Sequence, residues 1–223
     1  TGGHSNLTFK CEDATGRAVV LRRPPLGHVL ESAHDMSREY RIIHALRQTK
    51  VPVPEALGLC QDKTVNGADF YVMDFVEGVV LNDAVIGSTI PAQARPDLAH
   101  NVIHILCVLH DVDMDAVGLG TLGRKEAYLS RQLNRWNKQW QATKTHDIPE
   151  MEASSALLME RIPEQLGASI VHGDFRLGNM IVDQGRVEAI LDWELCTLGD
   201  PLADLGYLLN NWLGEDEVVG IDV

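Results

Sequence analysis

The feature that most constrains this sequence is a polar segment, a short hairpin pattern and a second polar segment. The first segment reads Val-His-Gly-Asp-Phe-Arg-Leu-Gly-Asn over residues 171–179, and the second reads Asp-Trp-Glu over 192–194. Between them, the apolar run 180–182 and the β-prone run 187–191 are separated by the turn sequence Asp-Gln-Gly-Arg. Two β-prone runs joined by such a turn predict an antiparallel hairpin.

This hairpin would bring two carboxylates and a carboxamide together. Asn179 precedes the first strand, Asp192 follows the second, and Asp174 lies on the loop that leads to the same end. Oxygen ligands of this kind suit Mg²⁺, which proteins usually hold by one or two carboxylates plus substrate phosphates. The alternative is three ordinary polar turn residues, but the spacing favours a metal and phosphate site.

The spacing matches the catalytic centre of eukaryotic-like kinases, in which an Asp accepts the substrate proton and an Asn and a second Asp hold magnesium. With Gly-Asp-Pro-Leu-Ala-Asp-Leu at 199–205, the sequence resembles the aminoglycoside phosphotransferase-like (APH/choline kinase-type) family. It is most similar to the branch fused to, or encoded beside, acyl-CoA dehydrogenases. The resemblance extends from Gly2 to Trp212.

The resemblance implies an α+β, protein-kinase-like fold with two lobes. We expect residues 1–77 to form an N-terminal nucleotide-binding lobe with a small antiparallel sheet, and the hinge to lie near residues 73–78. Residues 78–223 would form a mainly helical C-terminal lobe that carries the catalytic hairpin. Compared with the family, the sheet is expected to lack its first strand, and the C-terminal helices are expected to be truncated.

Composition limits the classes of partner and compartment. The 223 residues carry a formal net charge of −13, which argues against nucleic acid or an anionic membrane as the main partner. No apolar run is long enough for a membrane span, so cytoplasm, or an organelle matrix in a eukaryote, is expected. The four cysteines show no metal-binding or disulfide spacing and are expected to be small core residues (Cys11, Cys60, Cys107 and Cys196).

The N-terminal region is expected to hold the nucleotide phosphates. Strands are predicted near 7–10 and 18–22, with a glycine-containing turn at 13–17 between them. This turn is either an ordinary loop or, as the resemblance favours, a loop that covers phosphates. The resemblance also implies that three residues near the start of the chain contact the nucleotide (Gly3, Ser5 and Asn6).

A cation is expected on the second of these strands. Side chains alternate between the two faces of a strand, so Val20 and Arg22 share one face. In the family this face offers an apolar ceiling to adenine and then a lysine to the phosphates, and Arg22 takes the position of that lysine. Arg23 is the alternative candidate for this contact. The simplest explanation of Arg22 is a charged strand residue exposed to solvent. Glu39, early in a helix predicted at 37–48, is expected to pair with Arg22.

The region after that helix is expected to contain the hinge. Ser37 is the expected N-terminal cap of the preceding helix. After that helix, strands are predicted at 56–60 and 70–75, joined through a hairpin turn at Asn66-Gly67. The resemblance implies that the segment following the second strand contacts adenine through its backbone (Met73, Asp74 and Val76).

Further helices are expected at 81–85, 97–111, 125–144 and within 147–165. In the third of these, one apolar stripe indicates core packing (Leu129, Leu133, Trp136 and Trp140). Its basic residues form either a solvated face or a contact with an acidic substrate such as a CoA phosphate. A last helix is expected to begin near Leu202.

The resemblance assigns a role to each residue of the catalytic segment. Asp174 would orient and deprotonate an acceptor hydroxyl, while Arg176 would touch phosphate or acceptor. Asn179 and Asp192 would hold Mg²⁺ against the ATP phosphates. His172, Asp200 and Asp204 would support the loop without binding metal.

Three functions are therefore compared. The first is an ATP- and Mg²⁺-dependent kinase for a small-molecule hydroxyl, which the branch resemblance extends to a hydroxyacyl-CoA acceptor and to an acyl-CoA dehydrogenase domain or neighbour as partner. The second is a nucleotide-binding pseudokinase or interaction module, which the arginine at position 22 favours. The third is a metal-dependent phosphohydrolase, for which the expected additional ligands are missing from the sequence.

Overall fold

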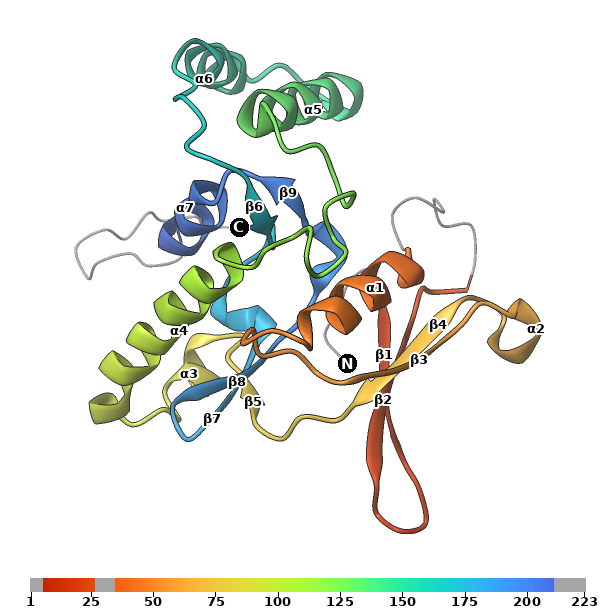
Figure 1. Ribbon diagram of the computed structural model, residues 1–223. Helices are drawn as coiled ribbons and strands as arrows, with labels where there is room; N and C mark the ends of the chain where they lie inside the picture. Colours follow the sequence, from red (N-terminus) through yellow and green to blue (C-terminus); the bar gives the residue numbers. More distant parts are fainter. Residues whose placement is uncertain (1–5, 27–34, 211–223) are drawn as a thin grey trace.

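The computed structural model describes residues 6–26 and 35–210, which form a two-lobed α+β fold (Figure 1). The strands are β1 (Leu7–Glu12), β2 (Ala18–Arg23), β3 (Ala56–Cys60), β4 (Phe70–Asp74), β5 (Val79–Val80), β6 (Ser169–Val171), β7 (Met180–Asp183), β8 (Arg186–Ile190) and β9 (Thr197–Gly199). The α-helices are α1 (Met36–Leu46), α2 (Lys63–Asn66), α3 (Ala84–Gly87), α4 (Arg95–His110), α5 (Tyr128–Thr143), α6 (Pro149–Glu160) and α7 (Leu202–Asn210). Short 3₁₀ turns cover Ala92–Ala94, Leu177–Asn179 and Trp193–Leu195.

A four-stranded antiparallel sheet with helix α1 beside it builds the N-terminal part. The strand order is β1-β2-β4-β3, and β1 is the exposed edge. Buried residues of α1 such as Ile42 and Leu46 join Val20, Tyr71 and Met73 of the sheet in one apolar core. Burial of these side chains holds α1 beside the sheet.

Helix α1 begins one residue earlier than predicted and has a different cap. Asp35 has an extended backbone, and its carboxylate accepts the Arg38 N–H at 2.9 Å. This is the N-cap geometry expected of a short acidic side chain. The prediction of Ser37 as the cap is wrong, because Ser37 lies inside the first turn and donates its hydroxyl to Asp35 at 2.6 Å.

The connection between β3 and β4 also differs from the prediction. The two strands pair antiparallel as expected, but the one-turn helix α2 lies between them. Asp62 caps this helix, and Gly67 ends it with a left-handed φ of +75°. A two-residue hairpin turn and a helix C-terminus both use Asn-Gly for its left-handed backbone, so the pattern does not separate them.

The predicted catalytic hairpin is present. Strands β7 and β8 pair antiparallel, with Met180 opposite Ile190 and Asp183 opposite Arg186. Gln184 and Gly185 turn the chain with φ values of 46° and 78°. The strand β5 extends this hairpin to a three-stranded sheet, and β6 pairs with β9 behind the catalytic segment.

Several predicted core residues are exposed. Helices α5 and α6 lie together at the edge of the fold (Figure 1), and Trp136 of the predicted core stripe is 53% exposed. Tyr128 is the buried residue of α5, so the apolar stripe is not a core stripe. Cys11 and Cys107 are also exposed, whereas Cys196 is buried. Within residues 6–26 and 35–210, no helix has the length and apolar character needed to cross a lipid bilayer.

Candidate active site

The loop between β6 and β7 is fixed from below by helix α7. Both oxygens of the Asp204 carboxylate accept backbone N–H groups, from His172 and from Gly173, each at 2.8 Å. Asp204 is fully buried and also accepts from His110 Nε2 at 3.2 Å. Asp200 caps α7 by accepting the Leu202 N–H at 3.0 Å. The expected supporting positions of Asp200 and Asp204 are thus present in the structure.

His172 links the loop to the residue that follows β8. Its Nε2 lies 2.9 Å from the Leu191 carbonyl oxygen, which can only accept, so this nitrogen carries the proton. Its Nδ1 accepts the Asp174 N–H at 3.2 Å. Burial lowers the pKa of His172 although the nearby Asp204 charge opposes this, in keeping with a neutral ring that shapes the loop.

The Asp174 carboxylate lies at the centre of the loop and accepts hydrogen bonds from side chains within the loop. Asn179 Nδ2 donates to Oδ2 at 2.6 Å and to the Asp174 carbonyl oxygen at 2.9 Å. Arg176 Nε lies 3.2 Å from Oδ1. Gly178 leaves the space that Arg176 needs, because a Cβ at position 178 would overlap its guanidinium group. Asp174 is therefore held in one orientation.

Asp192 follows β8 in a left-handed backbone conformation, with φ +65° and ψ +62°. This conformation is uncommon for a residue other than glycine and is frequent at functional sites. The Leu191 N–H donates to the Asn179 carbonyl oxygen at 2.8 Å, which closes the hairpin as predicted. Asn179 and Asp192 therefore lie at the same open end.

Arg22 reaches this end from the sheet. Its Nε lies 3.1 Å from Glu39 Oε2, and its Nη2 lies 2.5 Å from Asp192 Oδ1. Burial alone would lower the pKa of Arg22, but the charges of Glu39 and Asp192 raise it above its usual value. Burial raises the pKa of Glu39, and the Arg22 charge opposes that shift. The predicted pairing of Arg22 with Glu39 is present, whereas Arg23 stacks on Phe9 on the other face.

The start of β1 lies at the same end of the molecule. Asn6 is buried, and its Nδ2 donates to Glu194 Oε2 at 3.0 Å. Gly3 and Ser5 lie outside the described residues. The expectation that the turn at 13–17 covers phosphates is wrong, because the register pairs Thr8 with Arg22 and puts the turn at the opposite end of the hairpin. At about 3.3 Å per residue, that end is roughly 15 Å from Arg22.

The predicted hinge residues lie at the end of β4, which pairs with β2, and just beyond it. Val20 pairs with Met73 in the sheet, and both side chains are buried. The Asp74 N–H donates to the Glu55 carbonyl oxygen at 2.9 Å, and its carboxylate forms an exposed ion pair with Arg17 at 3.8 Å. Val76 lies in the segment that connects β4 to β5. These positions put the segment after Met73 beside the strand that carries Arg22.

Two residues near the site were missed by the sequence analysis. Tyr207 of α7 hydrogen-bonds Asp174 and Arg176, and the bond to Asp174 raises the pKa of its phenol. Arg38 of α1 donates to the carbonyl oxygens of Leu122 at 3.0 Å and Cys196 at 2.7 Å. Tyr207 follows Asp204 by three residues, so helical spacing could have placed both on the face towards the loop.

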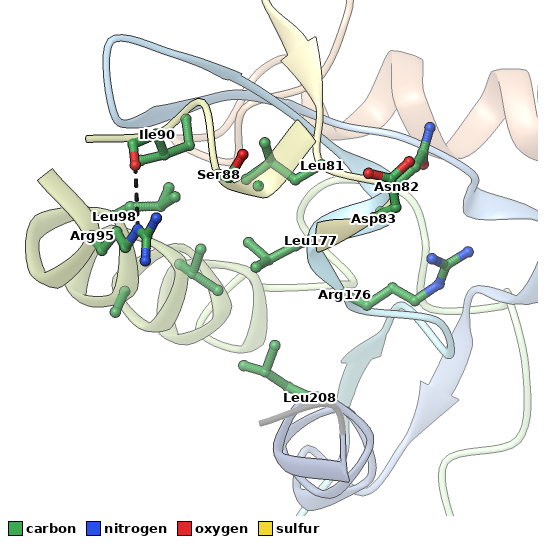
Figure 2. A pocket seen from close by; sticks show the side chains of 14 residues that line it. Leu81, Asn82, Asp83, Ser88, Ile90, Arg95, Leu98, Arg176, Leu177 and Leu208 are labelled. Carbon is green, nitrogen blue, oxygen red and sulfur yellow. Dashed lines mark hydrogen bonds between the residues drawn. The ribbon is translucent and has the colours of Figure 1, made fainter. Parts of the chain in front are cut away.

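A cavity of about 670 Å³ lies beside the loop between β6 and β7 (Figure 2). Segment 81–90, helix α4, loop residues 176–178 and α7 form its wall. The lining is mixed: about half is apolar (Leu81, Ile90, Leu98, Ala99, Val102, Leu177 and Leu208), and polar or charged side chains supply much of the rest (Asn82, Asp83, Ser88, Arg95 and Arg176). Arg95 Nε donates to the Ile90 carbonyl oxygen at 3.2 Å. The cavity could therefore take a molecule with both an apolar part and a polar part, the polar part facing Arg176.

Comparison with known proteins decides the family. The sequence profile of the phosphotransferase enzyme family matches residues 1–221. The chain belongs to this family. An aminoglycoside phosphotransferase-type protein of Ralstonia eutropha, 37% identical, superposes with a TM-score of 0.82 over 100% of this chain and 67% of that one. The kinase-like fold implied by the sequence is thereby confirmed.

Other phosphotransferase relatives are more distant or much longer. A ternary complex of aminoglycoside phosphotransferase APH(4)-Ia with ADP and hygromycin B shares the fold, with a TM-score of 0.66, 21% identity and coverage of 93% of this chain and 69% of that one. Acyl-CoA dehydrogenase family member 10 of Mus musculus is 41% identical over 92% of this chain and 19% of its own length. For family member 11 of Gallus gallus the values are 40%, 93% and 27%. The chain thus spans about a fifth to a quarter of these curated relatives.

Proposed function

We propose that this phosphotransferase is an ATP- and Mg²⁺-dependent small-molecule kinase that transfers the γ-phosphoryl group to a hydroxyl. The observation that carries the proposal is the convergence of Asp174, Asn179 and Asp192 with the Arg22–Glu39 pair at one end of the hairpin. Phosphoryl transfer depends mainly on positioning and charge neutralisation. These residues provide both.

The donor set fits Mg²⁺. The amide nitrogen of Asn179 donates to Asp174, so its amide oxygen Oδ1 is the atom that could bind the metal. Asp192 adds a carboxylate. Both are hard oxygen ligands of the kind that Mg²⁺ takes together with phosphates and water. When bound, ATP would supply the phosphoryl group, and the metal would supply much of the positive charge that neutralises the phosphates.

The remaining residues bind and orient. Asp174 accepts the proton of the acceptor hydroxyl, and its carboxylate is kept in position by Asn179 and Arg176. Arg22 neutralises phosphate charge from the sheet side. Asn6, Val20, Met73, Asp74 and Val76, together with Gly3 and Ser5, are proposed to surround the nucleotide.

We further propose a hydroxyacyl-CoA as acceptor. The cavity beside Arg176 combines apolar side chains with two arginines, Arg95 and Arg176, and this lining suits an acyl chain with an anionic end better than a polycationic aminoglycoside. The longer relatives are named as acyl-CoA dehydrogenase family members. These names support an acyl-CoA dehydrogenase as the partner, either as a fused domain or as a neighbouring protein. A hydroxyl group near one end of the acyl chain of the acceptor would meet Asp174 at the end of the cavity nearest the loop.

A pseudokinase is the second candidate, and one observation favours it. Arg22 replaces the lysine expected from the resemblance and pairs with Asp192, the proposed metal ligand. A pseudokinase of this kind would bind nucleotide without transferring phosphate. The intact set of Asp174, Asn179 and Asp192 supports the kinase instead.

The nucleotide site is tested by the Asp192→Asn variant, because asparagine tolerates the left-handed backbone but lacks the charge. At 100 times its Kd, ATP should stabilise the wild type by about 2.7 kcal/mol in the presence of Mg²⁺. For a chain of this length, that is a rise in Tm of about 5–10 °C in a thermal melt.

The variant should lose most of this rise. Asp183→Asn is the matched control, since Asp183 is exposed at the turn of the same hairpin and should leave the rise intact. An equal rise in Tm for Asp192→Asn and wild type would contradict the assignment of Asp192.

A further inference from the structure

The Arg22 side chain joins two carboxylates that come from different parts of the fold. Glu39 belongs to α1, and Asp192 follows the catalytic hairpin. The Glu39 side chain is 2% exposed, that of Arg22 11% and that of Asp192 29%. Arg22 Nη1 also donates to Thr8 Oγ1 at 3.4 Å. The guanidinium group is therefore largely enclosed, and Asp192 is the more exposed of its two carboxylate partners.

This geometry depends on an arginine. The planar guanidinium has separate N–H groups that point at the two carboxylates at the same time, from Nε and from Nη2. A lysine ammonium is a single point charge on a flexible stem and lacks this fixed fork. Arginine also keeps its charge at every pH at which the protein is folded.

The contact has a consequence for metal binding. Asp192 Oδ1 is held by a permanent cation at hydrogen-bond distance. A divalent ion at the same oxygen would lie next to the guanidinium charge, so that one of the two must leave. ATP phosphates entering the site would offer Arg22 other oxygen partners, since guanidinium groups bind phosphate as well as carboxylate.

We propose that Arg22 is a built-in counter-ion for Asp192 that keeps divalent cations off this carboxylate until a nucleotide is present. Phosphates then take over the guanidinium group, and Asp192 is released to the metal. Metal and nucleotide consequently bind as one unit. This inference rests on the proposed role of Asp192 in the kinase.

Binding of Mn²⁺ alone tests the inference, measured by the electron paramagnetic resonance signal of the free ion without nucleotide. Arg22→Lys keeps a cation for Glu39 but releases Asp192, and it should bind Mn²⁺ at least tenfold more tightly than the wild type. The double variant Arg22→Met/Glu39→Gln removes both members of the buried pair and should show the same gain. It also covers the case in which the single variant fails to fold.

Two controls assign the effect. Arg23→Lys changes the neighbouring arginine on the other face of β2 and should bind Mn²⁺ like the wild type. Asp192→Asn added to Arg22→Lys should abolish the gain. With a non-hydrolysable ATP analogue present in both samples, the wild type and Arg22→Lys should bind Mn²⁺ with equal affinity.

The inference is overturned if neither Arg22 variant binds Mn²⁺ alone more tightly than the wild type does. Because Mn²⁺ is measured first without nucleotide, failure of the counter-ion role is distinguishable from failure of the kinase assignment, which the ATP-dependent rise in Tm reports.

Discussion

Replacing Asp174 with asparagine is expected to lower the rate of phosphoryl transfer by about 10²–10⁴-fold, the usual contribution of a positioned general base. Asparagine keeps the shape of the side chain and one oxygen for the hydrogen bond from Asn179. It cannot accept the proton of an acceptor hydroxyl. The rate is measured as acceptor-dependent formation of ADP at saturating ATP and Mg²⁺.

Nucleotide binding separates this effect from a general loss of structure. Asp174→Asn should keep the ATP-dependent rise in Tm, because Asp174 is not placed among the metal ligands. Asp183→Asn, in the turn of the same hairpin, should transfer phosphate at the wild-type rate. A rate for Asp174→Asn within a few-fold of the wild type would show that another group takes the proton.

Replacing Asp204 with alanine is expected to destabilise the protein by about 3–5 kcal/mol, as loss of one partner of a buried charged network does. Two backbone N–H groups, of His172 and Gly173, and the His110 ring would lose their acceptor. Buried donors without a partner carry the full cost of desolvation. The free energy of unfolding in urea measures the change.

Asp204→Asn provides the comparison for this stability effect. Asparagine keeps one acceptor oxygen but turns an amide N–H₂ towards the second backbone donor, so an intermediate loss is expected. Asp183→Ala removes an exposed carboxylate and should change the stability by less than about 0.5 kcal/mol. Equal stability of Asp204→Ala and wild type would contradict the bracing role of α7.

The sequence predicted those parts of the site that depend on short-range chain geometry. The turn between 183 and 186 sets the pairing of β7 with β8, and this pairing places Asn179 beside Asp192. Alternation along β2 put Arg22 on the same face as Val20, and the resemblance then favoured Arg22 over Arg23. The resemblance placed Glu39 and Asp204, and the structure shows the contact of Glu39 with Arg22 and of Asp204 with the loop.

Contacts that depend on packing between distant elements were not predictable in the same way. Tyr207 touches Asp174 because α7 packs beneath the loop, and no motif marks this residue. The turn at 13–17 contains glycine, as a phosphate loop would, but the strand register places it away from Arg22. Trp136 follows helical spacing, yet α5 packs at the edge of the fold and leaves it exposed.

The central claim, that this chain is a kinase, is tested most directly by the mass spectrum of a hydroxyacyl-CoA panel after incubation with the wild-type protein, Mg²⁺ and ATP labelled in the γ-phosphoryl oxygens. We expect one labelled phosphoryl group on an acceptor hydroxyl, product formation slowed by at least about 100-fold with Asp174→Asn, and no label on streptomycin offered as a polycationic control. Release of labelled phosphate to water at a rate independent of every acceptor would contradict the account and indicate a hydrolase. Nucleotide binding with no transfer to any acceptor would also contradict it and favour the pseudokinase.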